Sequence, residues 1–189
     1  MNKFTPQQSM NRLIKGNKIY VNNCRNPADI SADIRWQTAH RTQRPFATVL
    51  TCSDSRVPPE HIFSTGIGEI FVVRTAGNVV GDFELGSVEY AAQHLYTPIV
   101  LIMGHSHCGA VAAALHGHAN GYIEDIIREI QRGLHGATEE DAAIYNNILH
   151  SKRRIMESKI IQHLIHTEQL AIVCAKYAID TGKVHFFKC

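Results

Sequence analysis

The chain has 189 residues, of which 44% are hydrophobic and 19% charged, so we expect one globular domain spanning residues 1–189 rather than a disordered chain. Nineteen Lys and Arg residues stand against 17 Asp and Glu residues, and this net charge of +2 disfavours nucleic acid as a partner, since phosphate binding requires a marked basic excess. No apolar run reaches the roughly 18 residues of a membrane span, and residues 1–9 are polar, so we expect a cytoplasmic protein with no membrane partner.

The first predicted element is a helix at about residues 5–21. Its apolar side chains are Met10, Leu13, Ile14 and Ile19. We expect this helix to be an N-terminal arm, because it would have little of its own domain to cover.

Four short runs farther along the chain predict strands, at residues 46–52, 69–74, 98–104 and 169–175. They are rich in β-branched residues and apolar throughout, a pattern typical of parallel strands that are covered on both faces. Gly182 then turns the chain into a last predicted strand at residues 184–187.

Helical spacing of apolar residues predicts a helix at residues 82–95, another that starts just after Cys108, and a long helical pattern at residues 138–166. Residues 117–141 are predicted to be surface structure. The alternation of strands and helices predicts an α/β fold with a mostly parallel central sheet of four strands, a C-terminal edge strand and flanking helices. In such folds ligands bind beyond the carboxyl ends of the strands.

Potential metal ligands follow two of these strands at that edge. Cys52 ends the first strand, and His105 and Cys108 follow the third. Two thiolates and one imidazole leave the fourth tetrahedral position of a zinc ion open, which is the pattern of catalytic rather than structural zinc sites. Taken singly, a Cys at a strand end is more often a small buried apolar residue and a lone His a satisfied polar one, so that alternative stays open at this point.

The chain contains five cysteines, an odd number at irregular spacing. This pattern disfavours a disulfide framework and favours metal ligation or catalysis for at least some of them.

Asp54 and Arg56 lie close to Cys52 and favour a catalytic role for the site. Residues two apart in an irregular turn can point the same way, and an arginine fork binds a carboxylate through two hydrogen bonds. Such a pair would keep Asp54 ionised and oriented beside the metal. The alternative is an ordinary loop salt bridge of little consequence.

The motifs C-S-D-S-R-V-P-P-E, F-V-V-R-x-A-G-N, E-Y-A and G-H-S-x-C-G-A-V, in this order, resemble the β-class carbonic anhydrases. The resemblance covers nearly the whole chain. It implies zinc-dependent reversible hydration of carbon dioxide to bicarbonate and a proton, with one Zn²⁺ per chain held by Cys52, His105 and Cys108, and a homodimer or tetramer. It implies Asp54 and Arg56 as the catalytic pair. It also implies a substrate pocket lined by Gln43, Phe71, Tyr90 and Gly109, with Gln43 reaching across from a neighbouring subunit.

The sequence departs from the family pattern in places. His107 is a tempting extra ligand at a variable position, and we expect it to face solvent or a helix N-terminus instead. Lys159 stands where many relatives have proline, so we expect a softer break in the long helical region. Val49 and Thr51 replace the tryptophan and glycine of the bicarbonate-inhibited members, so we expect Asp54 to stay paired with Arg56.

Two alternative functions remain open from the sequence. The same scaffold and ligands could hydrolyse carbonyl sulfide or carbon disulfide, or the zinc could stabilise a module without catalysis. A nucleotide-binding domain is excluded on motif, because no glycine-rich phosphate loop follows any predicted strand.

Overall fold

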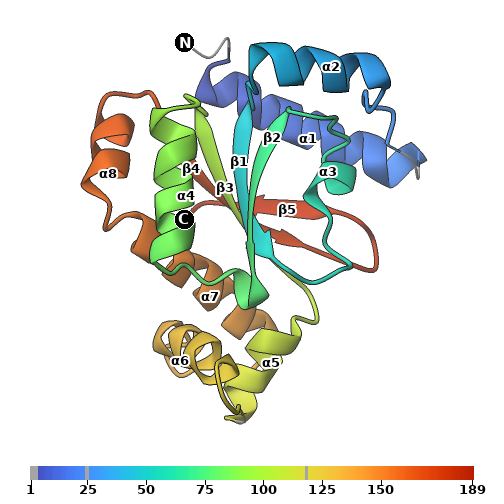
Figure 1. The fold of residues 1–189 in the computed structure, drawn as a ribbon. Helices are drawn as coiled ribbons and strands as arrows, with labels where there is room; N and C mark the ends of the chain where they lie inside the picture. Colours follow the sequence, from blue (N-terminus) through green and yellow to red (C-terminus); the bar gives the residue numbers. More distant parts are fainter. Residues whose placement is uncertain (1–3, 24–25, 118) are drawn as a thin grey trace.

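A five-stranded sheet forms the centre of the molecule in the computed structural model, which describes residues 4–23, 26–117 and 119–189 (Figure 1). The strands are β1 (Ala47–Cys52), β2 (Ile70–Thr75), β3 (Ile99–His105), β4 (Ala171–Tyr177) and β5 (Val184–Phe187), in the spatial order β2-β1-β3-β4-β5. The first four are parallel, and β5 pairs antiparallel with β4. The predicted α/β class, with four parallel strands and a C-terminal edge strand, is confirmed.

The strand order creates a crevice at one end of the sheet. The chain leaves β1 to form β2 on one side and then returns to form β3 on the other, which is the topology that opens a ligand site beyond the strands' carboxyl ends. Both β1 and β3 are buried along their whole length, as continuous apolar strands between two helical layers should be. Thr51 pairs with Met103, so Cys52 and His105 emerge side by side at this end.

Helices cover the two faces of the sheet unequally. One face packs against α4 (Asp82–Gln93), α7 (Glu140–Ile155) and α8 (Lys159–His166), while α5 (Gly109–His116) and α6 (Ile123–Gly133) pack against α7 beyond the carboxyl ends of the strands (Figure 1). The other face packs against α1 (Pro6–Asn23) and the short α3 (Pro59–Ile62). In Figure 1, α5 and α6 lie together at the lower end, and α2 (Ala32–Arg41) lies above β1 and β2.

The N-terminal helix is part of the chain's own core, which corrects the expectation that it has little to cover. Leu13 is fully buried in the cluster formed with the sheet. Asn17 donates to the carbonyl oxygens of Ile62 (3.2 Å) and Gly182 (2.9 Å), and Arg12 pairs with Glu69. The helix α2 was not predicted from the sequence, and none of its residues is buried.

The long helical pattern at residues 138–166 consists of two helices with a complete break. Helix α7 ends at Ile155, and Ser158 caps α8 by accepting a hydrogen bond from the amide of Ile161 (3.1 Å). The predicted softer break is therefore wrong, because a serine cap ends and restarts a helix without any need for proline.

Residues 117–141 are more than surface structure. Helix α6 buries Ile127 and Ile130 in the same core cluster as α5 and α7. Its strongly amphipathic sequence explains this packing, since apolar residues repeat at helical spacing on one side. The prediction for this segment is wrong for that face of α6.

Two of the five cysteines are joined. Cys174 in β4 forms a disulfide with Cys189, with 6.0 Å between their Cα atoms, whereas the sequence disfavoured disulfides. The antiparallel return of β5 brings the two thiols together, which no spacing along the chain indicates. Cys24 lies outside the described residues.

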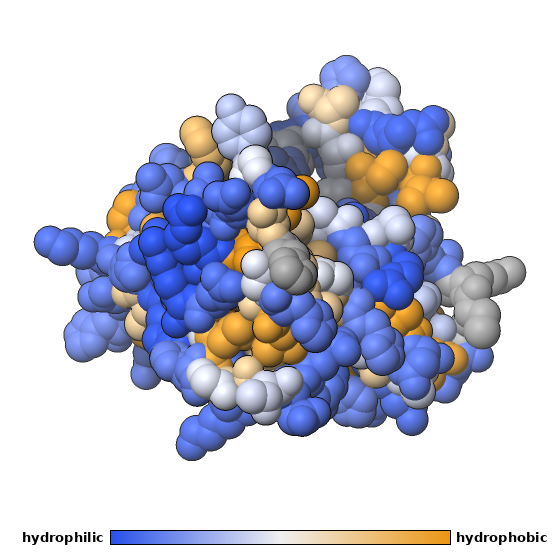
Figure 2. Space-filling view, turned by 90° about the horizontal axis from the view of Figure 1, so that it is seen from below, coloured by the Kyte–Doolittle hydropathy of each residue, from blue (hydrophilic) through white to orange (hydrophobic). Residues whose placement is uncertain are grey.

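The described residues contain no helix that is long and apolar enough to cross a membrane. Figure 2 shows the end of the molecule that lies lowest in Figure 1: it is mainly hydrophilic, and apolar side chains reach the surface in separate small areas.

Candidate metal centre and active site

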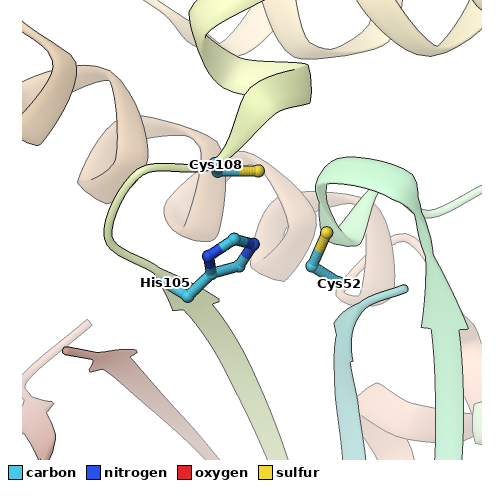
Figure 3. A group of neighbouring side chains, drawn as sticks. All are labelled: Cys52, His105 and Cys108. Carbon is cyan, nitrogen blue, oxygen red and sulfur yellow. The ribbon is translucent and has the colours of Figure 1, made fainter. Parts of the chain in front are cut away.

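Three side chains with metal-ligating atoms converge in the crevice. Cys52 ends β1, His105 ends β3, and Cys108 directly precedes α5 (Figure 3). Their ligand atoms all lie within 4.8 Å of one another, and the residues are only 4%, 0% and 2% exposed. The register of β1 against β3 places two of these residues, and the tight turn between β3 and α5 returns the third.

His105 is oriented as a metal ligand. Its Nδ1 lies 2.9 Å from the carbonyl oxygen of Ser106, an acceptor that fixes the proton on Nδ1. Its Nε2 is buried and has no hydrogen-bond partner within the described chain. A buried lone pair without a partner is costly, and a cation at this point removes that cost. The residues therefore fit a metal ion.

The two thiols lie close together, and each affects the ionisation of the other. The neighbouring Cys108 thiol and the backbone N–H groups of Asp54 and Gly77 lower the pKa of Cys52, against the opposing effect of burial. The same interaction raises the pKa of Cys108, and burial raises it further. Two adjacent buried thiolates repel each other, so both ionise together only with a cation between them.

Asp54 and Arg56 form a fork beside the cluster. Arg56 donates from Nε to Oδ1 (3.0 Å) and from Nη2 to Oδ2 (2.7 Å) of Asp54. These bonds hold the pKa of Asp54 at about 2, although partial burial acts in the opposite direction. Asp54 Oδ2 lies 3.9 Å from His105 Nε2, so an ionised carboxylate faces the same space as the three ligand atoms.

His107 lies between two members of the cluster in sequence but points away from it. Its side chain is 73% exposed, with Nδ1 3.7 Å from Glu140 Oε1. Its backbone has φ of +55°, and its carbonyl oxygen accepts from Arg56 Nη2 (3.0 Å). The backbone of His107 thus supports the fork while its imidazole faces solvent, as expected.

The four pocket residues lie in two separate places. Gly109 opens α5 beside Cys108, and a Cβ atom added there would meet no atom of another part of the chain within 4 Å. Phe71 and Tyr90 contact each other, with ring centroids 6.2 Å apart. However, Phe71 stands four residues before Thr75, the partner of Cys52, which is about 13 Å along β2.

Gln43 lies at the same distant end of the sheet as Phe71. It is exposed in the segment that leads into β1, and no described side chain pairs with it. A single chain therefore does not place the predicted pocket residues Gln43, Phe71 and Tyr90 next to its own metal ligands.

Residues 47–184, well over half of the chain, match the sequence profile of the family described as Carbonic anhydrase. The fold is similar to the Coccomyxa β-carbonic anhydrase solved in complex with acetazolamide, with a TM-score of 0.73 and 28% identity over 82% of this chain and 78% of that one. The chain belongs to the β-class carbonic anhydrase family.

Three further carbonic anhydrases align with this chain over most of their own length. Carbonic anhydrase 2 of Mycobacterium tuberculosis is 33% identical over 194 residues, which cover 97% of this chain and 93% of the relative. The carbonic anhydrase of Mycolicibacterium smegmatis is 36% identical over 157 residues, or 76% of this chain and 75% of the relative. The β-carbonic anhydrase CcaA has a TM-score of 0.73 and 26% identity, covering 95% of both chains.

In this β-class carbonic anhydrase, Arg74 supports the active-site turn in a way that the sequence did not reveal. Arg74 donates from Nε to the carbonyl oxygen of Cys52 (3.0 Å) and from Nη2 to that of Asp54 (2.7 Å). An arginine inside an otherwise apolar strand was the available signal, because a cation there needs nearby acceptors.

Proposed function

We propose that this chain catalyses the reversible hydration of carbon dioxide to bicarbonate and a proton, with one Zn²⁺ per chain bound by Cys52, His105 and Cys108. The observation that supports this most directly is the buried, unpaired Nε2 of His105, which faces two thiol sulfurs and an ionised Asp54. A purely structural zinc site has no use for an oriented carboxylate beside an open fourth position.

When bound, zinc supplies the Lewis acidity that lowers the pKa of water from about 15.7 to about 7. Two thiolate ligands neutralise more of the metal's charge than imidazoles would. We therefore expect the activity to rise with pH in the range above neutral. The N–H groups that donate to Cys52 counter part of this effect.

Asp54 orients the attacking water molecule. Because its pKa is held at about 2, the carboxylate is ionised at working pH and can only accept a hydrogen bond. It therefore fixes the direction of one O–H bond and leaves the oxygen lone pair free for the carbon atom of the substrate. Arg56 acts through Asp54 by holding both of its oxygens.

A second copy of the chain completes the substrate pocket. The strand β2 is the edge of the sheet, and a two-fold axis perpendicular to this strand brings the amino end of one copy's β2 beside the carboxyl end of the other's. That arrangement places Gln43, Phe71 and Tyr90 of one copy near the metal ligands of the other. Tyr90 is 48% exposed in the single chain, as a side chain awaiting a partner would be. The aromatic rings then form the apolar wall for carbon dioxide, and Gln43 binds a substrate oxygen.

Metal analysis combined with activity assays tests the proposal. Purified protein should contain one zinc per chain and hydrate carbon dioxide, and both properties should be lost on chelation and return with Zn²⁺. Assays of sulfide release from carbonyl sulfide and carbon disulfide run in parallel. Sulfide release without carbon dioxide hydration would overturn the proposed substrate, and bound zinc without either activity would overturn the enzyme assignment.

A further inference from the structure

Buried polar residues surround the turn that follows β2, where the amide of Gly77 contacts Cys52. Asn147 and Ser151, one turn apart on α7, and Asn78, in the short turn η1 (Ala76–Asn78), are each only 1% exposed. The neighbouring core positions Ile144 and Ile148 on α7 are apolar. Buried amides and hydroxyls cost free energy unless they are hydrogen-bonded, so these residues require an explanation.

Both polar residues of α7 bind the turn η1. Asn147 donates from Nδ2 to the carbonyl oxygen of Gly77 (2.8 Å). The Ser151 hydroxyl lies 2.8 Å from the carbonyl oxygen of Asn78 and accepts from Asn78 Nδ2 (3.2 Å). Helix α7 therefore holds the turn through hydrogen bonds to its backbone and side chain.

The turn carries a hydrogen-bond donor for the metal centre. The amide of Gly77 donates to Cys52 Sγ at 3.2 Å. Gly77 has φ of +67°, and a Cβ atom added there would lie 2.6 Å from Ile130 Cδ1 on α6. The position of this amide is thus set from both α6 and α7.

The side chain of Asn147 has one hydrogen-bonded end and one unpaired end. Its Oδ1 is buried and has no hydrogen-bond partner among the described residues, which costs free energy. What asparagine gains at this position is the hydrogen bond from its Nδ2 to the carbonyl oxygen of Gly77.

We propose that Asn147 and Ser151 are positioning residues that act through Gly77 to hold an N–H donor on the sulfur of Cys52. This donor withdraws charge from the thiolate and fixes the direction of its metal-binding lone pair, which strengthens metal binding and raises the metal's Lewis acidity. The inference rests on the proposed metal site and assigns a function to residues outside the ligand set and outside the catalytic pair.

Metal affinity and the spectrum of the Co²⁺-substituted protein test this role in the variants Asn147→Leu and Ser151→Ala. Loss of a partner that orients a ligand typically weakens metal binding by about 10- to 100-fold, and we expect a loss in this range for Zn²⁺ in competition with a chelator. We also expect a shift of the thiolate-to-Co²⁺ charge-transfer band, because the charge on Cys52 changes. Ser151→Thr retains the hydroxyl and should restore both properties toward wild type.

Ile155→Ala is the matched control, since Ile155 is buried on the same helix but has only a hydrocarbon side chain and cannot hydrogen-bond the turn. It should lower the melting temperature while leaving Zn²⁺ affinity and the Co²⁺ band unchanged. The inference is overturned if Asn147→Leu and Ser151→Ala bind Zn²⁺ with wild-type affinity and show the wild-type Co²⁺ band. If Asn147→Leu does not fold, Ser151→Ala decides by the same two measurements. Failure of the wild-type protein to bind either metal would instead refute the proposed function.

Discussion

Cys108 supplies one of the two sulfur atoms of the cluster, and its replacement by serine removes a soft ligand without changing the shape of the site. A hydroxyl stays protonated at neutral pH and is a far poorer ligand for zinc than a thiolate. We expect Cys108→Ser to lose most of its bound zinc and its activity. Cys189→Ser is the matched control, because its sulfur is bonded to Cys174 rather than placed in the cluster. One zinc per chain in Cys108→Ser, measured by metal analysis, would refute the ligand assignment.

A substitution at Asp54 tests catalysis independently of metal binding, because Asp54 is not one of the three proposed metal ligands. Asp54→Asn keeps the size of the side chain and leaves the three ligands in place, but its amide is no longer an anionic acceptor. We expect full zinc content and a fall in kcat of about 10²-fold or more, the usual range for a group that orients a reacting proton. Stopped-flow hydration assays at equal zinc content measure this. An unchanged kcat would show that the pair has no catalytic role.

The fork between Asp54 and Arg56 also makes a pH-dependent contribution to stability. In the unfolded chain an aspartate has a pKa of about 3.9, and Arg56 holds the pKa of Asp54 at about 2 in the folded protein. A lowered folded pKa stabilises the protein fully above the unfolded value, and this contribution is lost as pH falls from about 4 toward about 2. Removing Arg56 removes the effect.

We therefore expect the stability difference between wild type and Arg56→Ala to be largest above pH 4 and to shrink at pH 3. Urea unfolding of the metal-free proteins at pH 6 and pH 3 measures it. A difference that grows on acidification would contradict the assignment of the fork as the cause.

At the scale of elements, the break between α7 and α8 depends on one cap. Ser158 accepts from the amide of Ile161, and its hydroxyl also binds Glu89 on α4. Loss of a serine cap costs about 1 kcal/mol, so Ser158→Ala should lower the melting temperature by about 2–4 °C in a chain of this size. Ser158→Thr, which retains the hydroxyl, is the control. Equal melting temperatures for Ser158→Ala and wild type would mean that packing alone ends α7.

Element prediction from the sequence succeeded where the signal was local. All five strands were predicted to within two residues at each end, because continuous β-branched runs between turn residues mark buried parallel strands. Helix α2 was missed, since it buries nothing and so has no apolar stripe. The packing of α6 was missed for a different reason: its apolar stripe is clear, but its partners α5 and α7 are defined only by the fold.

At the scale of the whole molecule, the disulfide between Cys174 and Cys189 fixes the C-terminus to the sheet. A loop of about 15 residues closed in this way is worth at most about 3 kcal/mol of unfolding free energy. In protein denatured without reductant, alkylation should leave Cys174 and Cys189 unmodified, and Cys189→Ser should unfold at a lower urea concentration. Alkylation of both residues in the absence of reductant would contradict the pairing.

Shared active sites make a further prediction about the assembly. If Gln43 serves the metal site of the other copy, each active site combines Cys108 of one copy with Gln43 of the other. Cys108→Ser then damages the variant chain's own metal site, and Gln43→Ala damages the site of its partner. Refolding a mixture of the two variants should then give more activity than either alone, because a mixed dimer contains one complete site. Light scattering should show a mass of at least twice 21.1 kDa. No gain on mixing would place Gln43 in its own chain's site or outside both.

The sequence by itself determined the strands, the α/β class and the residues that converge on the metal centre. These features are local: a buried strand requires a continuous apolar run, and the three ligands directly follow two such strands. The tertiary structure decided which segments meet. It packed α1 against its own sheet, joined Cys174 to Cys189 and kept Phe71 and Tyr90 away from the metal ligands. It also brought Asn147 and Ser151 into hydrogen bonds with the turn η1 beside Cys52. Contacts of this kind depend on the pairing of surfaces distant in the chain, and the periodicity of a single segment describes only its own face.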